Sequence, residues 1–365
     1  MIKNPFKFGS VVDGAYFTNR EEEISKVSSI LKSENHLIII SPRRFGKTSL
    51  IKKVTNTIKR PTIYLDLQLV TSPEDLTAQL LKKLHYHYPL ENLKQFIKSF
   101  RILPTISLNP LSSEIDISFQ PVQSVSVLIE DVFNLIENIS KKRKKIIVVL
   151  DEFQEIKNIA KGLDKKLRST IQHHQKVNYV FLGSQESLMR DIFEKKKSPF
   201  YHFGYLMNLN KIPYPEFFNY LSKGFSKISN RAEEISNEIL AFTNAHPYYT
   251  QQLAFTSFEV FLKKNTESKV VEKSINEIVR THDNDFERLW RTLNRTDMKV
   301  LIGLTQTEVS PLSNEFNVKN RIGSSSTIFS SIKRLQEKGI VIKAETKYEI
   351  DDPFFKTWIK LRRQF

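Results

Sequence analysis

The chain has 365 residues, a length that predicts roughly two or three domains, and its 40% of hydrophobic residues are enough to form their cores. The absence of cysteine excludes disulfides and thiolate metal sites and suits a reducing compartment. No apolar run approaches the ~20 residues of a membrane helix and none follows the first methionine, so we expect neither a membrane span nor a signal peptide. The formal net charge of +16 favours a nucleotide or a nucleic acid as partner, although a lysine-rich surface alone gives the same balance.

Residues 36–59 predict a phosphate-binding loop between a strand and a helix. The apolar run 37–40 predicts the strand, and it leads into Ser41-Pro42-Arg43-Arg44-Phe45-Gly46-Lys47-Thr48 and a helix that ends near residue 59. Backbone N–H groups of such a loop wrap a di- or triphosphate. Lys47 would reach the β- and γ-phosphates, and the Thr48 hydroxyl would ligate Mg²⁺. Ser41 replaces the usual first glycine and is less free to adopt a positive φ.

The next part of the chain predicts further layers of an α/β domain. A strand is expected at 61–66 and a helix at 73–87. Alternating apolar and polar residues predict a surface hairpin inserted at about 104–120. A helix at 124–140 follows. The basic run 141–145 is interpreted as a solvated turn in preference to a phosphate contact.

Two carboxylates follow a strand that the sequence predicts to be fully buried. Residues 146–150 are all apolar, without alternation, as in a parallel sheet that is covered on both faces. Asp151 and Glu152 then lie at the carboxyl end of the strand, where α/β sheets bind their ligands. Asp151 is expected to coordinate Mg²⁺ through water, and Glu152 to activate the attacking water.

A strand near 178–183 ends in two polar residues. Ser184 is the candidate sensor of the γ-phosphate and Gln185 the second choice; the alternative for Ser184 is a cap of the next helix. A fifth strand is predicted at 205–209. Helices at 215–223, 231–243, 247–263 and 271–289 then predict a separate helical subdomain. We therefore expect domains at 1–212, 213–293 and 294–365.

The last domain has the pattern of a winged helix. Helices are predicted at 297–304, 312–318 and 325–338, followed by a hairpin at 340–350. Thr327, Ser331, Arg334 and Lys338 are expected on an exposed face of the third helix, where they would meet DNA phosphates and base edges. The alternative is a winged helix that packs on the ATPase core or on another protein.

Four motifs together resemble the archaeal and bacterial ATPases of the AAA+-like, signal-transduction NTPase group, the archaeal-type ATPase domain. They are Phe17-Thr18-Asn19-Arg20-Glu21, Pro42-Arg43-Arg44-Phe45-Gly46-Lys47-Thr48-Ser49-Leu50, Leu150-Asp151-Glu152-Phe153-Gln154 and Ala245-His246-Pro247-Tyr248-Tyr249. The resemblance covers residues 10–290, and the C-terminal region resembles the winged helix that commonly follows.

The resemblance implies a P-loop NTPase with a five-stranded parallel sheet in the order 5-1-4-3-2, a helical lid, and ATP or ADP with Mg²⁺ as ligands. It also implies that Arg20 and His246-Pro247 approach the adenine or ribose. The nucleotide is thus expected at Arg20, Ser41, Pro42, Arg43, Arg44, Phe45, Gly46, Lys47, Thr48, Ser49, His246 and Pro247. Residues 199–203 lack the arginine that relatives often carry there, so no phosphate-sensing arginine is transferred.

These patterns favour a cytoplasmic, Mg²⁺-dependent ATPase that acts slowly as a switch. The expected catalytic residues are Glu152, Lys47 and Ser184. The expected metal ligands are Thr48 and Asp151. ATP would move the lid and winged helix, and the cycle would regulate a nucleic-acid or protein assembly, with another protein or a second copy of the chain as the expected protein partner. The alternatives are a DNA-binding winged-helix regulator with a structural, poorly hydrolysed nucleotide, and an interaction protein whose site is inactive because of Ser41.

Overall fold

The structure is a computed structural model that describes residues 2–12, 14–89, 93, 97–98, 100–108, 115–119, 125–264, 269–307, 309–344 and 347–363. The chain divides into two compact units. We call residues 20–42 and 47–210 the sheet unit, and residues 1–19, 43–46 and 211–365 the helical unit. Across the described ranges, none of the helices combines the length and apolar character needed to cross a membrane.

The sheet unit is built on five parallel strands. They are β1 (Leu37–Ile40), β2 (Thr62–Asp66), β5 (Ile146–Asp151), β6 (Val177–Gly183) and β7 (Tyr205–Asn208), in the order β2-β5-β6-β1-β7. If these five strands are numbered 1 to 5 along the chain, their order is 2-3-4-1-5, which is the predicted order 5-1-4-3-2 read from the opposite edge. The predicted fold class and topology are therefore confirmed. Every residue of β5 and β6 is buried, as expected for strands covered on both faces.

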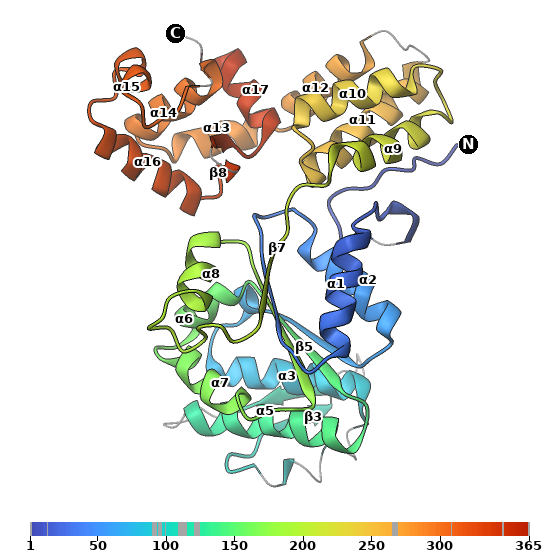
Figure 1. Cartoon of the computed structure of the whole chain (residues 1–365), viewed down its shortest axis with the longest axis vertical. Helices are drawn as coiled ribbons and strands as arrows, with labels where there is room; N and C mark the ends of the chain where they lie inside the picture. Colours follow the sequence, from blue (N-terminus) through green and yellow to red (C-terminus); the bar gives the residue numbers. More distant parts are fainter. Residues whose placement is uncertain are drawn as a thin grey trace. The chain divides into compact units, whose positions relative to one another are not determined.

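Helices pack around this sheet (Figure 1). Helix α1 (Glu21–Lys32) packs on α2 (Lys47–Ile58) and β1, whereas α3 (Pro73–His87), α5 (Val125–Lys142) and α7 (Leu163–Ile171) pack together against β2, β5 and β6. The unit is completed by α6 (Ile156–Ile159), α8 (Glu186–Phe193) and the short turns η2 (Leu67–Leu69) and η3 (Phe153–Glu155). The predicted surface hairpin is present as antiparallel β3 (Thr105–Leu108) and β4 (Ile115–Ser118); its turn lies outside the described residues.

The helical unit contains a group of helices, which we call the lid helices after the prediction, and a winged helix. The first group is α9 (Tyr214–Phe225), α10 (Ala232–Thr243), α11 (Pro247–Lys264), α12 (Val270–Thr281) and α13 (Asp283–Arg291). The second is α14 (Arg295–Gln306), α15 (Asn314–Asn320), α16 (Ser325–Glu337), the antiparallel pair β8 (Val341–Ala344) and β9 (Lys347–Ile350), and α17 (Pro353–Arg362). The single helix predicted at 271–289 is in fact two, with His282 between them.

The N-terminal residues, which include the short turn η1 (Gly14–Tyr16), belong to the helical unit. Phe6 is 2% exposed and packs against Phe225 and Phe258. A Cβ at Gly224 would lie 2.4 Å from the Phe6 ring, so only glycine allows this approach. Because the lid helices and the winged helix also share one hydrophobic core, the three-domain division remains a prediction.

A half-buried histidine, His36, and a buried one, His174, lie around β6 in the sheet unit. The Nδ1 atom of His174 lies 2.7 Å from the Tyr179 hydroxyl, and the Tyr179 amide donates to Nδ1 of His36 at 3.3 Å. Burial is the main cause that lowers the pKa of each histidine to about 4. Both rings are therefore neutral at neutral pH.

This pair predicts a pH-dependent stability. As the pH falls from 6.5 to 4, the unfolded chain binds protons at His36 and His174 that the folded chain does not, so the free energy of unfolding decreases. The slope should reach about 1.4 kcal/mol per pH unit for each histidine. Denaturant unfolding at several pH values measures it. His174→Gln should flatten the curve, and an unchanged curve would contradict this assignment.

Candidate nucleotide-binding and hydrolysis site

The loop between β1 and α2 has a backbone that accommodates Ser41. Positive φ angles occur at Arg44 (65°) and Gly46 (91°), whereas Ser41 is not among the residues with a positive φ. Ser41 is buried, and its amide donates to the Gly183 carbonyl on β6 at 3.3 Å. The missing first glycine therefore causes no backbone strain, which removes the sequence-based argument for an inactive site.

Lys47 and Thr48 open helix α2, as the motif predicts. The Lys47 ammonium donates to the carbonyls of Ser41 and Pro42, both at 2.9 Å, so the side chain curls back along its own loop. The Thr48 hydroxyl donates to Oδ2 of Asp151 at 3.1 Å. The loop threonine and the carboxylate at the end of β5 are thus in direct contact, as their predicted common role requires.

Tyr64 on β2 completes this contact and was missed by the sequence analysis. Its hydroxyl bonds Oδ2 of Asp151 and lies 3.2 Å from the Thr48 hydroxyl. Burial, and next the Asp151 carboxylate, raise the pKa of Tyr64, so the phenol stays protonated and acts as a donor. The sequence signal that could have indicated Tyr64 is its position two residues before Asp66. Asp66 on β2 pairs with Asp151 on β5.

The carboxyl edge of the sheet is strongly negative. Burial raises the pKa of Asp66, and the nearby Asp151, Glu152 and Glu155 raise it further. Such a cluster favours a bound cation beside the loop. No group of three or more His, Cys, Asp or Glu side chains positioned to hold a metal occurs among the residues that the structure describes.

Glu152 is held in an unusual conformation by the end of β6. Its backbone is left-handed (φ 50°, ψ 47°), which costs about 1–3 kcal/mol in a non-glycine residue and is common at functional sites. Its Oε2 accepts bonds from the Ser184 hydroxyl (2.6 Å), the Ser184 amide (3.2 Å) and the Gln154 side chain (2.6 Å). Since Gln185, and not Ser184, precedes the first turn of α8, the helix-cap alternative for Ser184 is wrong.

Gly183 leaves space for this arrangement. A Cβ at this position would lie 2.3 Å from the Met189 side chain and 2.8 Å from Oε1 of Gln154. A larger residue would displace the glutamine that bonds Glu152. The packing of β6 against α8 therefore contributes directly to the orientation of the glutamate.

The sequence matches a known family over most of its length. Residues 17–253, more than half of the chain, match the model of the ATPase domain predominantly from Archaea. The chain belongs to this archaeal ATPase family. Residues 284–361 match the model of a probable winged helix domain.

Relatives of the chain include two uncharacterized ATP-binding proteins of Methanocaldococcus jannaschii. One is 28% identical over 170 residues, covering 40% of this chain and 45% of the relative. The other is 25% identical over 158 residues, covering 40% of this chain and 43% of the relative. The match thus spans less than half the length of these relatives.

Solved structures with this fold include a Walker-type ATPase of Pyrococcus abyssi, with a TM-score of 0.67, 16% identity and coverage of 94% of this chain and 96% of that chain. The ORC2 protein of Aeropyrum pernix in its ADP form has a TM-score of 0.52 at 12% identity, covering 98% and 99%. The ORC1 protein of the same organism in complex with DNA has a TM-score of 0.50 at 14% identity, covering 93% and 91%. Identities this low establish a shared fold alone.

The remaining nucleotide-site residues predicted for this archaeal ATPase have protein partners. The Arg20 guanidinium is buried and donates to Glu23 at 2.8 Å and to the Asn210 carbonyl at 2.9 Å. His246 is 2% exposed, and its ring lies 4.8 Å from that of Phe45. Pro247 begins α11. Contact of Arg20, His246 or Pro247 with adenine or ribose stays a prediction, as do the nucleotide contacts of Arg43 and Ser49.

The prediction that Ser331 contacts DNA is wrong. Ser331 is fully buried, and its hydroxyl donates to Oδ1 of Asp297 at 2.5 Å, because it lies on the side of α16 that faces α14. Arg334 bonds the same carboxylate at 2.8 Å, and the Lys338 ammonium donates to the Thr292 carbonyl at 3.2 Å. Of the four predicted residues, Thr327 is exposed on α16, and the side-chain hydrogen bonds that the structure gives it are to Ser324, three residues earlier.

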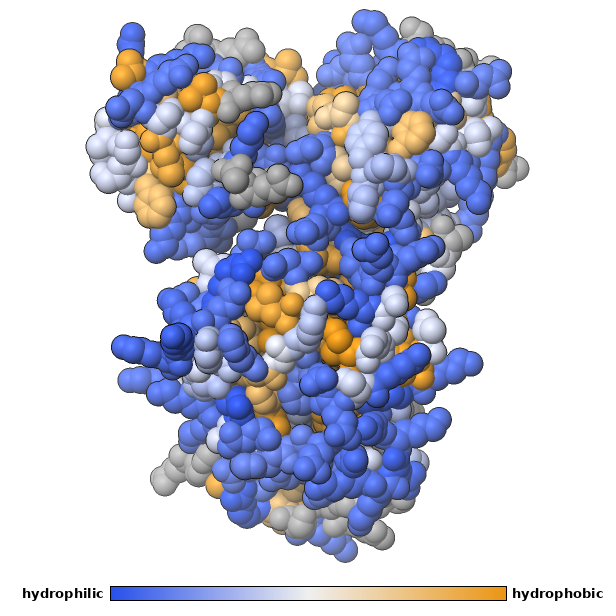
Figure 2. Space-filling view, in the orientation of Figure 1, coloured by the Kyte–Doolittle hydropathy of each residue, from blue (hydrophilic) through white to orange (hydrophobic). Residues whose placement is uncertain are grey.

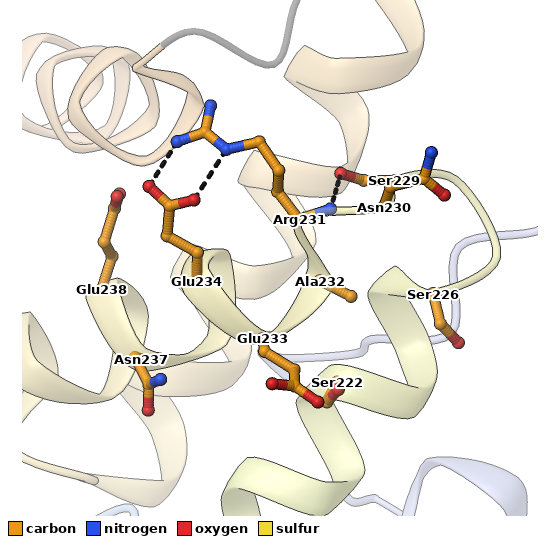
Figure 3. Close-up of a pocket in the computed structure, with 10 residues that line it drawn as sticks. All are labelled: Ser222, Ser226, Ser229, Asn230, Arg231, Ala232, Glu233, Glu234, Asn237 and Glu238. Carbon is orange, nitrogen blue, oxygen red and sulfur yellow. Dashed lines mark hydrogen bonds and ion pairs between the residues drawn. The ribbon is translucent and has the colours of Figure 1, made fainter.

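A depression of about 780 Å³ lies on the lid helices, and the residues that line it include none that was predicted for the nucleotide (Figure 3). It is lined by α9, α10 and the turn between them. Glu233, Glu234 and Glu238 line it, and its arginine, Arg231, bonds Glu234. The acidic lining disfavours a triphosphate, so this depression is not an alternative ATP site.

The Ser184–Glu152 bond should be measurable in a double-mutant cycle. A hydrogen bond to a carboxylate contributes about 1.5–3 kcal/mol, and Glu152→Gln removes the carboxylate but keeps its shape. We expect Ser184→Ala to lower the free energy of unfolding by about 1 kcal/mol more in the unaltered chain than in Glu152→Gln. Denaturant unfolding gives these values. Ser187→Ala, on the exposed face of α8, is the control, and additive effects would refute the bond.

Proposed function

We propose that this P-loop ATPase of archaeal type hydrolyses ATP slowly, with Mg²⁺, as a cytoplasmic switch. The observation that carries the proposal is the convergence of Thr48 from α2 and Asp151 from β5, beside a Glu152 held by the end of β6. A loop lysine, a loop threonine and a strand-end acidic pair are the parts with which P-loop enzymes position a triphosphate. Here three separate elements bring these parts together.

The residues present fit a magnesium ion. Thr48 Oγ1 and Asp151 Oδ2 are hard oxygen donors only 3.1 Å apart, and Mg²⁺ in such sites takes one or two protein ligands together with water and phosphate oxygens. The ion supplies neutralisation of the charge that develops on the phosphates. Tyr64 donates to Asp151 and so fixes the direction of that carboxylate.

Glu152 is the group that takes a proton from the attacking water. All three of its hydrogen bonds reach Oε2, so Oε1 is the oxygen to accept the proton. Ser184 and Gln154 fix the direction of the carboxylate by donating to Oε2. Lys47 moves from its carbonyl partners to the β- and γ-phosphates, which offer it a full opposite charge.

The phosphate loop connects the chemistry to the rest of the molecule. Residues 43–46 belong to the helical unit, while Ser41, Pro42 and Lys47 belong to the sheet unit. Within the helical unit, Arg44 contacts Tyr249 and Phe45 contacts His246 on the lid helices. We infer that ATP moves the lid helices and the winged helix, and that hydrolysis reverses the movement.

Two substitutions test the chemistry. Lys47→Ala should abolish ATP binding, whereas Glu152→Gln should keep binding and lower turnover by about a hundredfold or more, since general-base catalysis contributes about 10²–10⁴-fold. Binding of a fluorescent ATP analogue and release of phosphate measure the two effects. Lys32→Ala, at the exposed end of α1, removes the same charge and should change neither. Hydrolysis that persists in Lys47→Ala would overturn the proposal.

A second candidate function, binding of DNA by the winged helix, is favoured by the exposed side of α16. Ser326, Thr327, Ser330 and Lys333 are all exposed there, and hydroxyl and ammonium groups suit phosphate and base edges. Val318 and Phe329 are also exposed, and hydrophobic residues interrupt the hydrophilic surface of this domain (Figure 2). These side chains suit a protein partner or a second copy instead.

The DNA candidate predicts a salt-dependent affinity that involves Lys333. Lys333→Ala should weaken binding to a DNA duplex uniformly across sequences and reduce the slope of log K against log salt by about 1. Fluorescence anisotropy over a range of salt concentrations measures both. Lys338→Ala is the matched control, because its ammonium already bonds Thr292. Absence of binding to DNA would leave a protein assembly as the target of the switch.

A further inference from the structure

Two side chains from the middle of the phosphate loop are held by the lid motif. Arg44 donates to the Tyr249 hydroxyl at 3.1 Å, and its guanidinium lies 4.6 Å from the centroid of the Tyr248 ring. The Phe45 ring contacts the His246 ring edge to face, with centroids 4.8 Å apart. The run His246–Tyr249, which the resemblance associates with adenine or ribose, thus contacts the loop itself.

One residue of the winged helix contacts the same lid residues. Asp351, in the turn between β9 and α17, accepts a bond from the Tyr249 hydroxyl at 3.4 Å and faces Nε2 of His246 at 3.3 Å. Nδ1 of His246 accepts the Tyr248 amide, so Nε2 is the ring nitrogen that lies near Asp351. One carboxylate of the winged helix therefore lies against both residues that contact Arg44 and Phe45.

The loop backbone explains why this contact matters. Positive φ angles at Arg44 (65°) and Gly46 (91°) alternate with Arg43 and Phe45, which are not among the residues with a positive φ. Alternating left- and right-handed residues point successive N–H groups to one side and form an anion-binding concavity. Gly46 adopts its conformation freely, but Arg44 does so against the preference of its Cβ.

We propose that Tyr249 and Asp351 are positioning residues that hold Arg44 in the left-handed conformation and so preform the phosphate loop for ATP. We call Arg44, Phe45, His246, Tyr248, Tyr249 and Asp351 the loop clasp. The proposal rests on the proposed function, because it assigns the triphosphate to this loop. It makes the winged helix a regulator of nucleotide affinity: release of Asp351 loosens the loop, and bound nucleotide strengthens the clasp by the same factor.

Tyr249→Phe tests the clasp with little change in packing, since it removes only the hydroxyl between Arg44 and Asp351. We expect it to weaken binding of a fluorescent ATP analogue in the presence of Mg²⁺ by threefold to tenfold, a free-energy change of up to about 1.4 kcal/mol. Glu349→Gln is the matched control. Glu349 bonds Lys211 and Asn244 from the same part of the winged helix but is not part of the clasp, so affinity should stay within twofold.

Two variants of Arg44 separate the backbone effect from loss of the side chain. Arg44→Gly keeps easy access to the left-handed conformation and Arg44→Ala does not, so the glycine variant should bind the analogue more tightly than the alanine variant. Tyr249→Phe should add no further loss in either background, because its partner is already absent. Equal affinities of the two Arg44 variants, or a full additional loss from Tyr249→Phe, would overturn the proposal.

Hydrogen exchange of the nucleotide-free chain distinguishes failure of the clasp from failure of the proposed function. Amides of residues 43–47 should exchange faster in Tyr249→Phe than in Glu349→Gln. Equal exchange in these variants, with ATP bound normally by the unaltered chain, would refute the clasp alone. Faster exchange in a chain that does not bind ATP would support the clasp as a structural contact but refute its role in nucleotide binding and the proposed function.

Discussion

The site depends on holding two adjacent carboxylates in fixed directions at the end of a strand that is buried along its whole length. A carboxylate that gives up water on folding needs hydrogen-bond donors from the protein in its place. Thr48 and Tyr64 supply donors to Asp151, and Ser184 and Gln154 supply them to Glu152. These donors come from α2, β2, the end of β6 and η3, so the geometry of the site is set by the register of the sheet and not by one loop.

The parts of this arrangement that were predictable are those that a local pattern determines. Uninterrupted apolar residues at 146–150 predicted a strand in a parallel sheet, and the loop between a strand and a helix predicted the place of Lys47 and Thr48. The contact between Thr48 and Asp151 followed, because carboxyl ends of parallel strands share one edge. The strand order came from the family resemblance, since local periodicity does not state which strands are neighbours.

What escaped prediction depends on contacts between distant residues. Tyr64 looks like an ordinary strand residue until β2 is paired with β5. Ser331 was assigned to an exposed face of α16 from helical spacing, but the extent of the buried face depends on α14 and on the buried Asp297, which provides its partner. Helix α17 was not predicted, although Asp352 caps it and Pro353 occupies its first turn.

The division of the chain has a consequence for its connectivity. The backbone passes between the two units at residues 19–20, 42–43, 46–47 and 210–211, so two of the four passages lie on either side of residues 43–46. These four residues belong to the helical unit but are joined at both ends to chain of the sheet unit. An insertion or deletion among them would therefore change two covalent links between the units at once.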